Sequence, residues 1–145
     1  MFKTILVPFD GSKGAEGGLD KAIEIARHGD AQLLVLTVFR HHSMLEASFS
    51  MVRPADPENM DDIMRDHAKT VADHAKNRAR EAGVADVRAF VKPGQPARTI
   101  VSFAREKKAD LIVVGSRGAG SVEGFLLGSV SHKVTSLAQC PVLVV

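Results

Sequence analysis

The predicted fold depends on residues 109–131, which read ADLIVVGSRGAGSVEGFLLGSVS. Leu111 to Val114 is a short apolar run between a charged residue and a glycine, which predicts a buried strand. A cluster of glycines follows, and a helix is expected to begin near Gly128-Ser129. Glycines let the backbone approach a ligand closely, and free N–H groups at a helix N-terminus favour an anion. This order of elements predicts a phosphate site, with a glycine-rich connection that binds nothing as the alternative.

Two common phosphate loops do not fit this stretch. A P-loop has Lys followed by Ser or Thr after its second glycine, and no glycine of this chain is followed by Lys-Ser or Lys-Thr. The dinucleotide fingerprint could begin at Gly118-Ala119-Gly120, but Glu123 stands where its third glycine belongs. That fingerprint also follows the first strand of its fold, whereas this loop follows a late one. Both motifs are therefore excluded.

The rest of the chain alternates apolar runs with helical patterns. Strands are expected at residues 4–9, 33–39, 87–91, 111–114 and 141–145. The helices between them should begin near Ser12, Pro57, Pro96 and Gly128, and the last should carry one apolar face formed by Leu127, Val130, Val134 and Leu137. This alternation predicts an α/β fold with a single open parallel sheet of five strands and helices on both faces. At 145 residues it is one domain, 1–145.

Composition argues against several classes of partner and chemistry. The net charge of +2 gives no reason to expect a nucleic acid or a membrane surface. The single cysteine, Cys140, excludes an intramolecular disulfide and a thiolate metal cluster, and we expect it to be a buried structural thiol. His67 and His74 are seven residues apart, too far for the helical zinc pair, so we predict no metal-ligating side chains and no catalytic residues. With no membrane-span or signal-peptide pattern, we expect a cytoplasmic protein.

The glycine spacing is similar to that of a known family. Gly115, two residues, Gly118, nine residues and Gly128-Ser129 resemble the ATP-binding pattern of the universal stress protein family. The resemblance covers the whole chain, from KTILVPFDGS at residues 3–12 to CPVLVV at residues 140–145. It implies the adenine nucleotide alpha-hydrolase-like arrangement, with strand order 3-2-1-4-5. In such a sheet a ligand binds where strands 1 and 4 end, which is where the glycine loop begins.

The resemblance also implies a cofactor, ATP, with Mg²⁺ or Mn²⁺. Asp10, two residues after Pro8, would contact the ribose or, through the metal ion, the phosphates; a turn-forming Asp is the alternative. Val38, at the end of the second strand, would bind the edge of adenine through its backbone, with Pro8 beside the base. An ordinary core valine at this position is equally compatible with the sequence.

The resemblance assigns the phosphate contacts to the loop and the start of the last helix. These residues are Gly115, Arg117, Gly118, Gly128, Ser129, Val130 and Ser131. The glycines would present backbone N–H groups to the phosphates, and the serine hydroxyls would donate to phosphate or cap the helix. The arginine would pair with a phosphate or stay solvated.

The implied function is that of an ATP-binding regulatory module in the stress response, whose nucleotide state alters its assembly or its binding of protein partners that the sequence does not identify. The irregular residues 40–56 would become ordered over the bound nucleotide. A slow ATPase and a nucleotide-free dimeric interaction protein are the alternatives. The apolar strand from Pro141 to Val145 would form an edge of the sheet, and we expect it to pair with a second copy in a homodimer.

Overall fold

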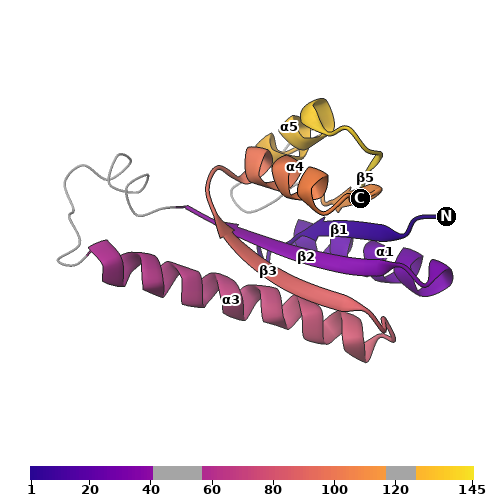
Figure 1. The fold of residues 1–145 in the computed structure, drawn as a ribbon, viewed down its shortest axis with the longest axis horizontal. Coiled ribbons are helices and arrows are strands. Elements are labelled where there is room, and N and C mark those ends of the chain that lie inside the picture. Colours follow the sequence, from indigo (N-terminus) through magenta and orange to yellow (C-terminus); the bar gives the residue numbers. More distant parts are fainter. Residues whose placement is uncertain (41–56, 117–126) are drawn as a thin grey trace.

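The structure is a computed structural model that describes residues 1–40, 57–116 and 127–145, shown in Figure 1. Strands and helices alternate along these ranges. In chain order they are β1 (Thr4–Pro8), α1 (Lys13–Gly29), β2 (Gln32–Phe39), α3 (Pro57–Glu81), β3 (Val87–Pro93), α4 (Pro96–Glu106), β4 (Leu111–Val114), α5 (Ser129–Leu137) and β5 (Val142–Val144). Most of the irregular segment expected at residues 40–56, all but Arg40, lies outside the described residues.

The strands form one parallel five-stranded sheet in the order β3-β2-β1-β4-β5, which confirms the predicted fold class. β1 lies in the middle, between β2 and β4, and Ile5, Leu6 and Val7 are completely buried there. Strands buried on both faces need apolar side chains at every position, which explains the uninterrupted apolar runs of the sequence. The chain crosses from one half of the sheet to the other between β3 and β4, so the ends of β1 and β4 border a crevice.

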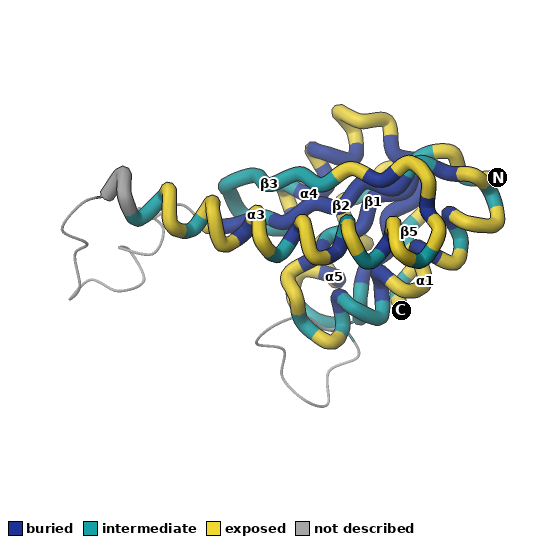
Figure 2. The backbone as a smooth tube through the Cα atoms, turned by 90° about the horizontal axis from the view of Figure 1, so that it is seen from below, coloured by how far each residue is buried: buried dark blue, intermediate teal, exposed yellow. Residues whose placement is uncertain are grey.

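Helices cover both faces of the sheet (Figure 1). α1 and α3 pack on one face in a cluster that includes Ile5, Val7 and Leu33, and α4 and α5 pack on the other with Leu6, Leu34 and Leu36. Neighbouring strand residues thus belong to opposite cores, as the alternation of a β-strand requires. Figure 2 shows the buried strands in the interior and the exposed outer sides of the helices.

Three details differ from the sequence-based expectations. β3 continues to Pro93 because Lys92 and Pro93 still pair with the end of β2, whereas β5 is shorter than expected and spans only Val142–Val144. The apolar face predicted for the last helix is wrong in part, since Val130 is 37% and Leu137 48% exposed. α5 packs against α4 and β5 at the margin of the sheet, and Ser131 and Val134 are its buried residues.

Candidate functional site

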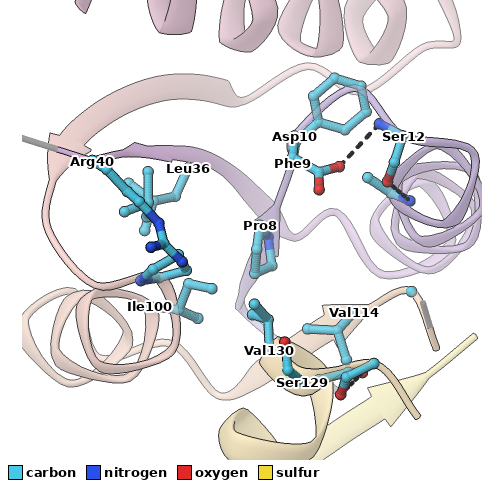
Figure 3. Close-up of a pocket in the computed structure, with 16 residues that line it drawn as sticks. Pro8, Phe9, Asp10, Ser12, Leu36, Arg40, Ile100, Val114, Ser129 and Val130 are labelled. Carbon is cyan, nitrogen blue, oxygen red and sulfur yellow. Dashed lines mark hydrogen bonds between the residues drawn. The ribbon is translucent and has the colours of Figure 1, made fainter. Parts of the chain in front are cut away.

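A cavity of about 350 Å³ opens at the edge of the sheet where β1 and β4 end, a volume typical of small-molecule sites (Figure 3). Its walls come from the ends of β1, β2 and β4, the β1–α1 turn, and the starts of α4 and α5. Of the residues predicted from the sequence, those that line it are Pro8, Asp10, Val38, Gly115, Gly128, Ser129, Val130 and Ser131. The other two, Arg117 and Gly118, lie outside the described residues.

Asp10 shapes the turn that leads from β1 to α1. Its Oδ1 accepts a hydrogen bond from the Ser12 N–H at 2.9 Å, and the Ser12 hydroxyl in turn accepts the Ala15 N–H at 3.2 Å and caps α1. Gly11 between them has φ of 82°, which a residue with a side chain rarely adopts. Asp10 therefore has the turn-forming role, and the same residue lines the cavity.

Val38 extends β2 beyond its partner strand. The pairing of β2 with β1 ends at Leu36 and Pro8, and the Leu36 carbonyl accepts the Phe9 N–H at 2.9 Å. In a parallel sheet, residues i and i+2 of a strand point their backbone N–H and C=O toward the same neighbouring strand. Leu36 points toward β1, so Val38 also points its N–H and C=O toward the β1 side, beyond the last β1–β2 pair. The next acceptor on that side, the Phe9 carbonyl, accepts the Thr37 hydroxyl at 2.8 Å. The backbone of Val38 thus faces the cavity beside Pro8.

The two described ends of the glycine-rich segment are joined by hydrogen bonds. The Gly128 N–H donates to the Ser116 carbonyl at 2.6 Å, and the Ser131 hydroxyl donates to the same carbonyl at 3.0 Å and to the Gly128 carbonyl at 3.1 Å. Ser131 is only 4% exposed, so its hydroxyl holds this junction together. Ser129 and Val130, in the same helical turn, are exposed beside the cavity.

The helices that start at the cavity differ in their N-caps. α1 is capped by the Ser12 hydroxyl, and α4 by Gln95, whose Oε1 accepts the Arg98 N–H at 2.9 Å. The N-cap of α5 is Gly128, which has no side chain to offer, and no side chain among the described residues caps this helix. An uncapped first turn leaves backbone N–H groups and the positive end of the helix dipole directed outward. The start of α5 can therefore receive an anion.

Gly115 has a packing role of its own at the end of β4. A Cβ atom on this residue would lie 2.5 Å from the carbonyl carbon and 3.0 Å from the Cα of Gly14 in the first turn of α1. Such overlap with the backbone leaves room for glycine alone. The close approach of α1 and β4 thus explains this glycine, whether or not a ligand binds.

The sequence analysis missed part of the cavity wall. Leu36, Arg40, Pro96 and Ile100 also line it, and Figure 3 shows Arg40 beside Leu36 and Ile100. The period of β2 contained a usable signal, because residues 34, 36, 38 and 40 must share one face of the sheet. The sequence pattern instead places Arg40 in the irregular segment and predicts for Pro96 only the start of a helix.

The described residues offer little other reactive chemistry. No three His, Cys, Asp or Glu side chains among them gather as metal ligands. Cys140 is half-buried, and burial is the main cause that raises the pKa of its thiol, which favours the unreactive protonated form. No helix in these ranges is both long and apolar enough to cross a bilayer.

Comparisons with known proteins agree with this architecture. The model of the universal stress protein family matches residues 1–145. The universal stress protein YxiE of Bacillus subtilis is 38% identical over 149 residues, which cover 100% of this chain and 99% of YxiE. The structure of the universal stress protein UspA from Lactobacillus plantarum superposes with a TM-score of 0.81 at 26% identity, covering 99% and 97% of the two chains. A universal stress protein solved in complex with cAMP has a TM-score of 0.72 at 29% identity, covering 99% and 96%.

Proposed function

This chain belongs to the universal stress protein family, and from that premise we propose that its cavity binds an adenine nucleotide, with ATP as the favoured ligand. Binding would make the protein a nucleotide-dependent regulatory module. The cAMP complex of a structural neighbour supports an adenine ligand for this architecture. The contacts of the cavity indicate how a nucleotide would lie in it.

The uncapped start of α5 is the observation that carries the proposal. α1 and α4 have side-chain caps, whereas α5 has Gly128 as its N-cap and receives no side-chain cap from the part of the chain that the structure describes. The backbone N–H groups of its first turn, at Ser129 and Val130, are suited to phosphate oxygens, and the helix dipole adds a favourable charge. We therefore place the phosphates at this end of the cavity.

The opposite end suits the base. Leu36, Ile100 and Pro96 give it an apolar wall, and Pro8 also lines the cavity. The Val38 N–H and C=O, directed past the end of β1, supply one donor and one acceptor for the edge of a purine. Apolar walls with a few fixed polar groups are typical of sites that bind small organic ligands.

Asp10 lies on a third side of the cavity, near Ser12 in Figure 3, where a ribose between base and phosphates would pass. Its carboxylate can accept hydrogen bonds from sugar hydroxyls. It is also the one carboxylate among the described residues that line the cavity. A Mg²⁺ or Mn²⁺ ion would have Asp10 as its protein ligand, with phosphate oxygens and water completing its shell, as is common for Mg²⁺. With one carboxylate that also holds its own turn, the site supports binding better than hydrolysis.

Calorimetric titration with ATP and Mg²⁺ tests the proposal. Val130→Glu places a carboxylate at the proposed phosphate end, where Val130 is exposed enough to be replaced without disturbing the core. We expect ATP affinity to fall at least about tenfold through repulsion between like charges. Leu137→Glu is the matched control, since it adds the same charge to an exposed position at the other end of α5. Absence of ATP binding to the unmodified protein, or equal losses in both variants, would contradict the proposal.

We also propose that the protein forms a homodimer through β5. The two edges of the sheet differ in character. Leu143 of β5 and Val145, which follows this strand, are 36% and 40% exposed, whereas the edge strand β3 carries Arg88, Lys92 and Pro93. Charges and proline on an edge strand discourage pairing, and an apolar edge invites it. The difference supports β5 as the strand that pairs with a second copy.

A further inference from the structure

Arg40 lines the cavity on the side of Leu36 and Ile100. Figure 3 shows Arg40 beside these two residues, with Ser129 and Val130 of α5 on the lower side of the cavity. The arginine directly follows β2, which ends at Phe39. Its position is therefore fixed by the sheet, on the wall assigned above to the base.

The period of β2 explains why the side chain enters the cavity. Leu34 and Leu36 belong to the core cluster on the α4 side of the sheet, and Val38 packs against the same cluster. Arg40 continues this row by two residues, and both Val38 and Arg40 line the cavity. Arg65 of α3, also near this end of β2, is used differently, since it lies over the Phe39 ring at 5.6 Å on the opposite face of the sheet.

We propose that Arg40 is a base-recognition residue, whose guanidinium plane stacks on one face of the bound purine and closes the apolar end of the cavity. This inference rests on the proposed nucleotide site and adds a determinant to it. A guanidinium is planar and weakly hydrated, and it stacks well on aromatic rings. The surroundings of Arg40 are apolar, with Leu36, Ile100 and Pro96 on the same wall, which suits a ring better than a phosphate.

The position of Arg40 argues against a phosphate contact. The turn of α5 that is suited to phosphate lies on the Ser129–Val130 side of the cavity, whereas Arg40 lies beside Leu36 and two residues past Val38 in the same row of side chains. A nucleotide with its phosphates at α5 therefore brings its base, not its phosphates, to Arg40. It follows that the contribution of Arg40 to affinity should be independent of the number of phosphates.

Titrations of the full-length protein with AMP and with ATP–Mg²⁺ test this inference. We expect Arg40→Ala to weaken the binding of both ligands by the same factor, about five- to tenfold. Arg40→Lys keeps the positive charge but replaces the planar guanidinium by an ammonium group, which does not stack on a ring in the same way. Its affinity for both ligands should therefore be little higher than that of Arg40→Ala. Arg105→Ala removes the same charge from an exposed position of α4 outside this cavity, and it should bind both ligands as the unmodified protein does.

The outcomes separate this inference from the proposal on which it rests. If the unmodified protein binds neither nucleotide, the proposed function itself is wrong. If it binds them and Arg40→Ala binds equally well, the function stands and the role of Arg40 is wrong. A larger loss for ATP than for AMP, or full recovery with lysine, would show that Arg40 acts as a charge near phosphate and would also overturn the inference. Thermal unfolding of each variant without nucleotide checks that the fold is intact.

Discussion

The Ser131 hydroxyl donates a hydrogen bond to the Ser116 carbonyl at 3.0 Å. Ser131 lies in the first turn of α5, and Ser116 lies two residues after the end of β4, so this hydrogen bond connects the two elements. The same carbonyl accepts the Gly128 N–H, and the Ser116 N–H donates to the Val145 carbonyl at 2.7 Å. Ser116 therefore links the start of α5 to the last residue after β5. The position of the proposed phosphate site depends on this junction.

Ser131→Ala should destabilise the folded protein by about 1–2 kcal/mol, because it removes a buried hydroxyl that donates to two carbonyl oxygens. Urea unfolding without nucleotide measures the change. Ser136→Ala is the control on the same helix, since that exposed hydroxyl donates only to the His132 carbonyl one turn before it. The control should change stability by less than about 0.5 kcal/mol. Equal stabilities of the two variants would contradict a structural role for Ser131.

Gly115→Ala should destabilise the protein by about 1–3 kcal/mol or more, because the new methyl group would overlap the Gly14 backbone. Gly17→Ala in α1 is the matched control. A Cβ there would meet only Val145, at 4.0 Å, and alanine favours a helix interior, so this variant should gain about 0.5–1 kcal/mol. Both are measured by chemical denaturation without nucleotide. A Gly115→Ala protein as stable as the unmodified one would show that α1 and β4 can separate without cost.

Asp10 should distinguish nucleotides by their sugar. If its carboxylate accepts ribose hydroxyls, the unmodified protein should bind ATP about tenfold more tightly than 2′,3′-dideoxy-ATP, as expected for hydrogen bonds to a charged group. Asp10→Ala should bind ATP more weakly and should lose this preference. Calorimetry with the two ligands gives all four affinities. A variant that retains the full preference would place the sugar elsewhere.

Replacing Leu143 with lysine should weaken the proposed dimer. Leu143 is the central residue of β5, and its side chain is 36% exposed at the apolar edge. A charge there should shift the protein toward monomer in sedimentation velocity experiments at fixed concentration. Arg88→Ala, on the opposite edge strand, serves as control and should not change the oligomeric state. A Leu143→Lys protein that remains as dimeric as the control would exclude β5 as the interface.

The sequence predicted the sheet well because its three central strands, β2, β1 and β4, are largely buried on both faces. Runs such as Thr4 to Phe9 and Leu33 to Phe39 are apolar at nearly every position, without the alternation of apolar and polar residues that marks a strand with one exposed face. The helices between these runs indicate that the strands are parallel. The last helix was predicted less well. The apolar residues Val130 and Leu137 have helical spacing, but both side chains are exposed because the helix lies at the margin of the sheet. The spacing of apolar residues predicts which side chains share one face of a helix, whereas their burial depends on whether another element packs against that face.

The site shows the same limit. The glycine spacing and the ends of strands 1 and 4 predicted where in the sheet the site lies. The family resemblance then predicted Pro8, Asp10 and Val38 as site residues, and all three line the cavity. Arg40 and Ile100 were missed because the cavity brings them together from β2 and α4, which are far apart in sequence. The packing role of Gly115 against Gly14 was also invisible, since a contact between two glycines leaves no pattern of side chains.

We propose that an adenine nucleotide lies in this cavity with its phosphates at α5 and its base beside Val38. An NMR titration of the ¹⁵N-labelled protein with ATP–Mg²⁺ distinguishes this placement from others. We expect the largest changes in amide shift at Val38 and Arg40, at Gly115, and at Ser129 to Ser131, with small changes on α3 and β3. Saturating ATP that leaves these amides unchanged, or that shifts only residues on the far face of the sheet, would contradict it.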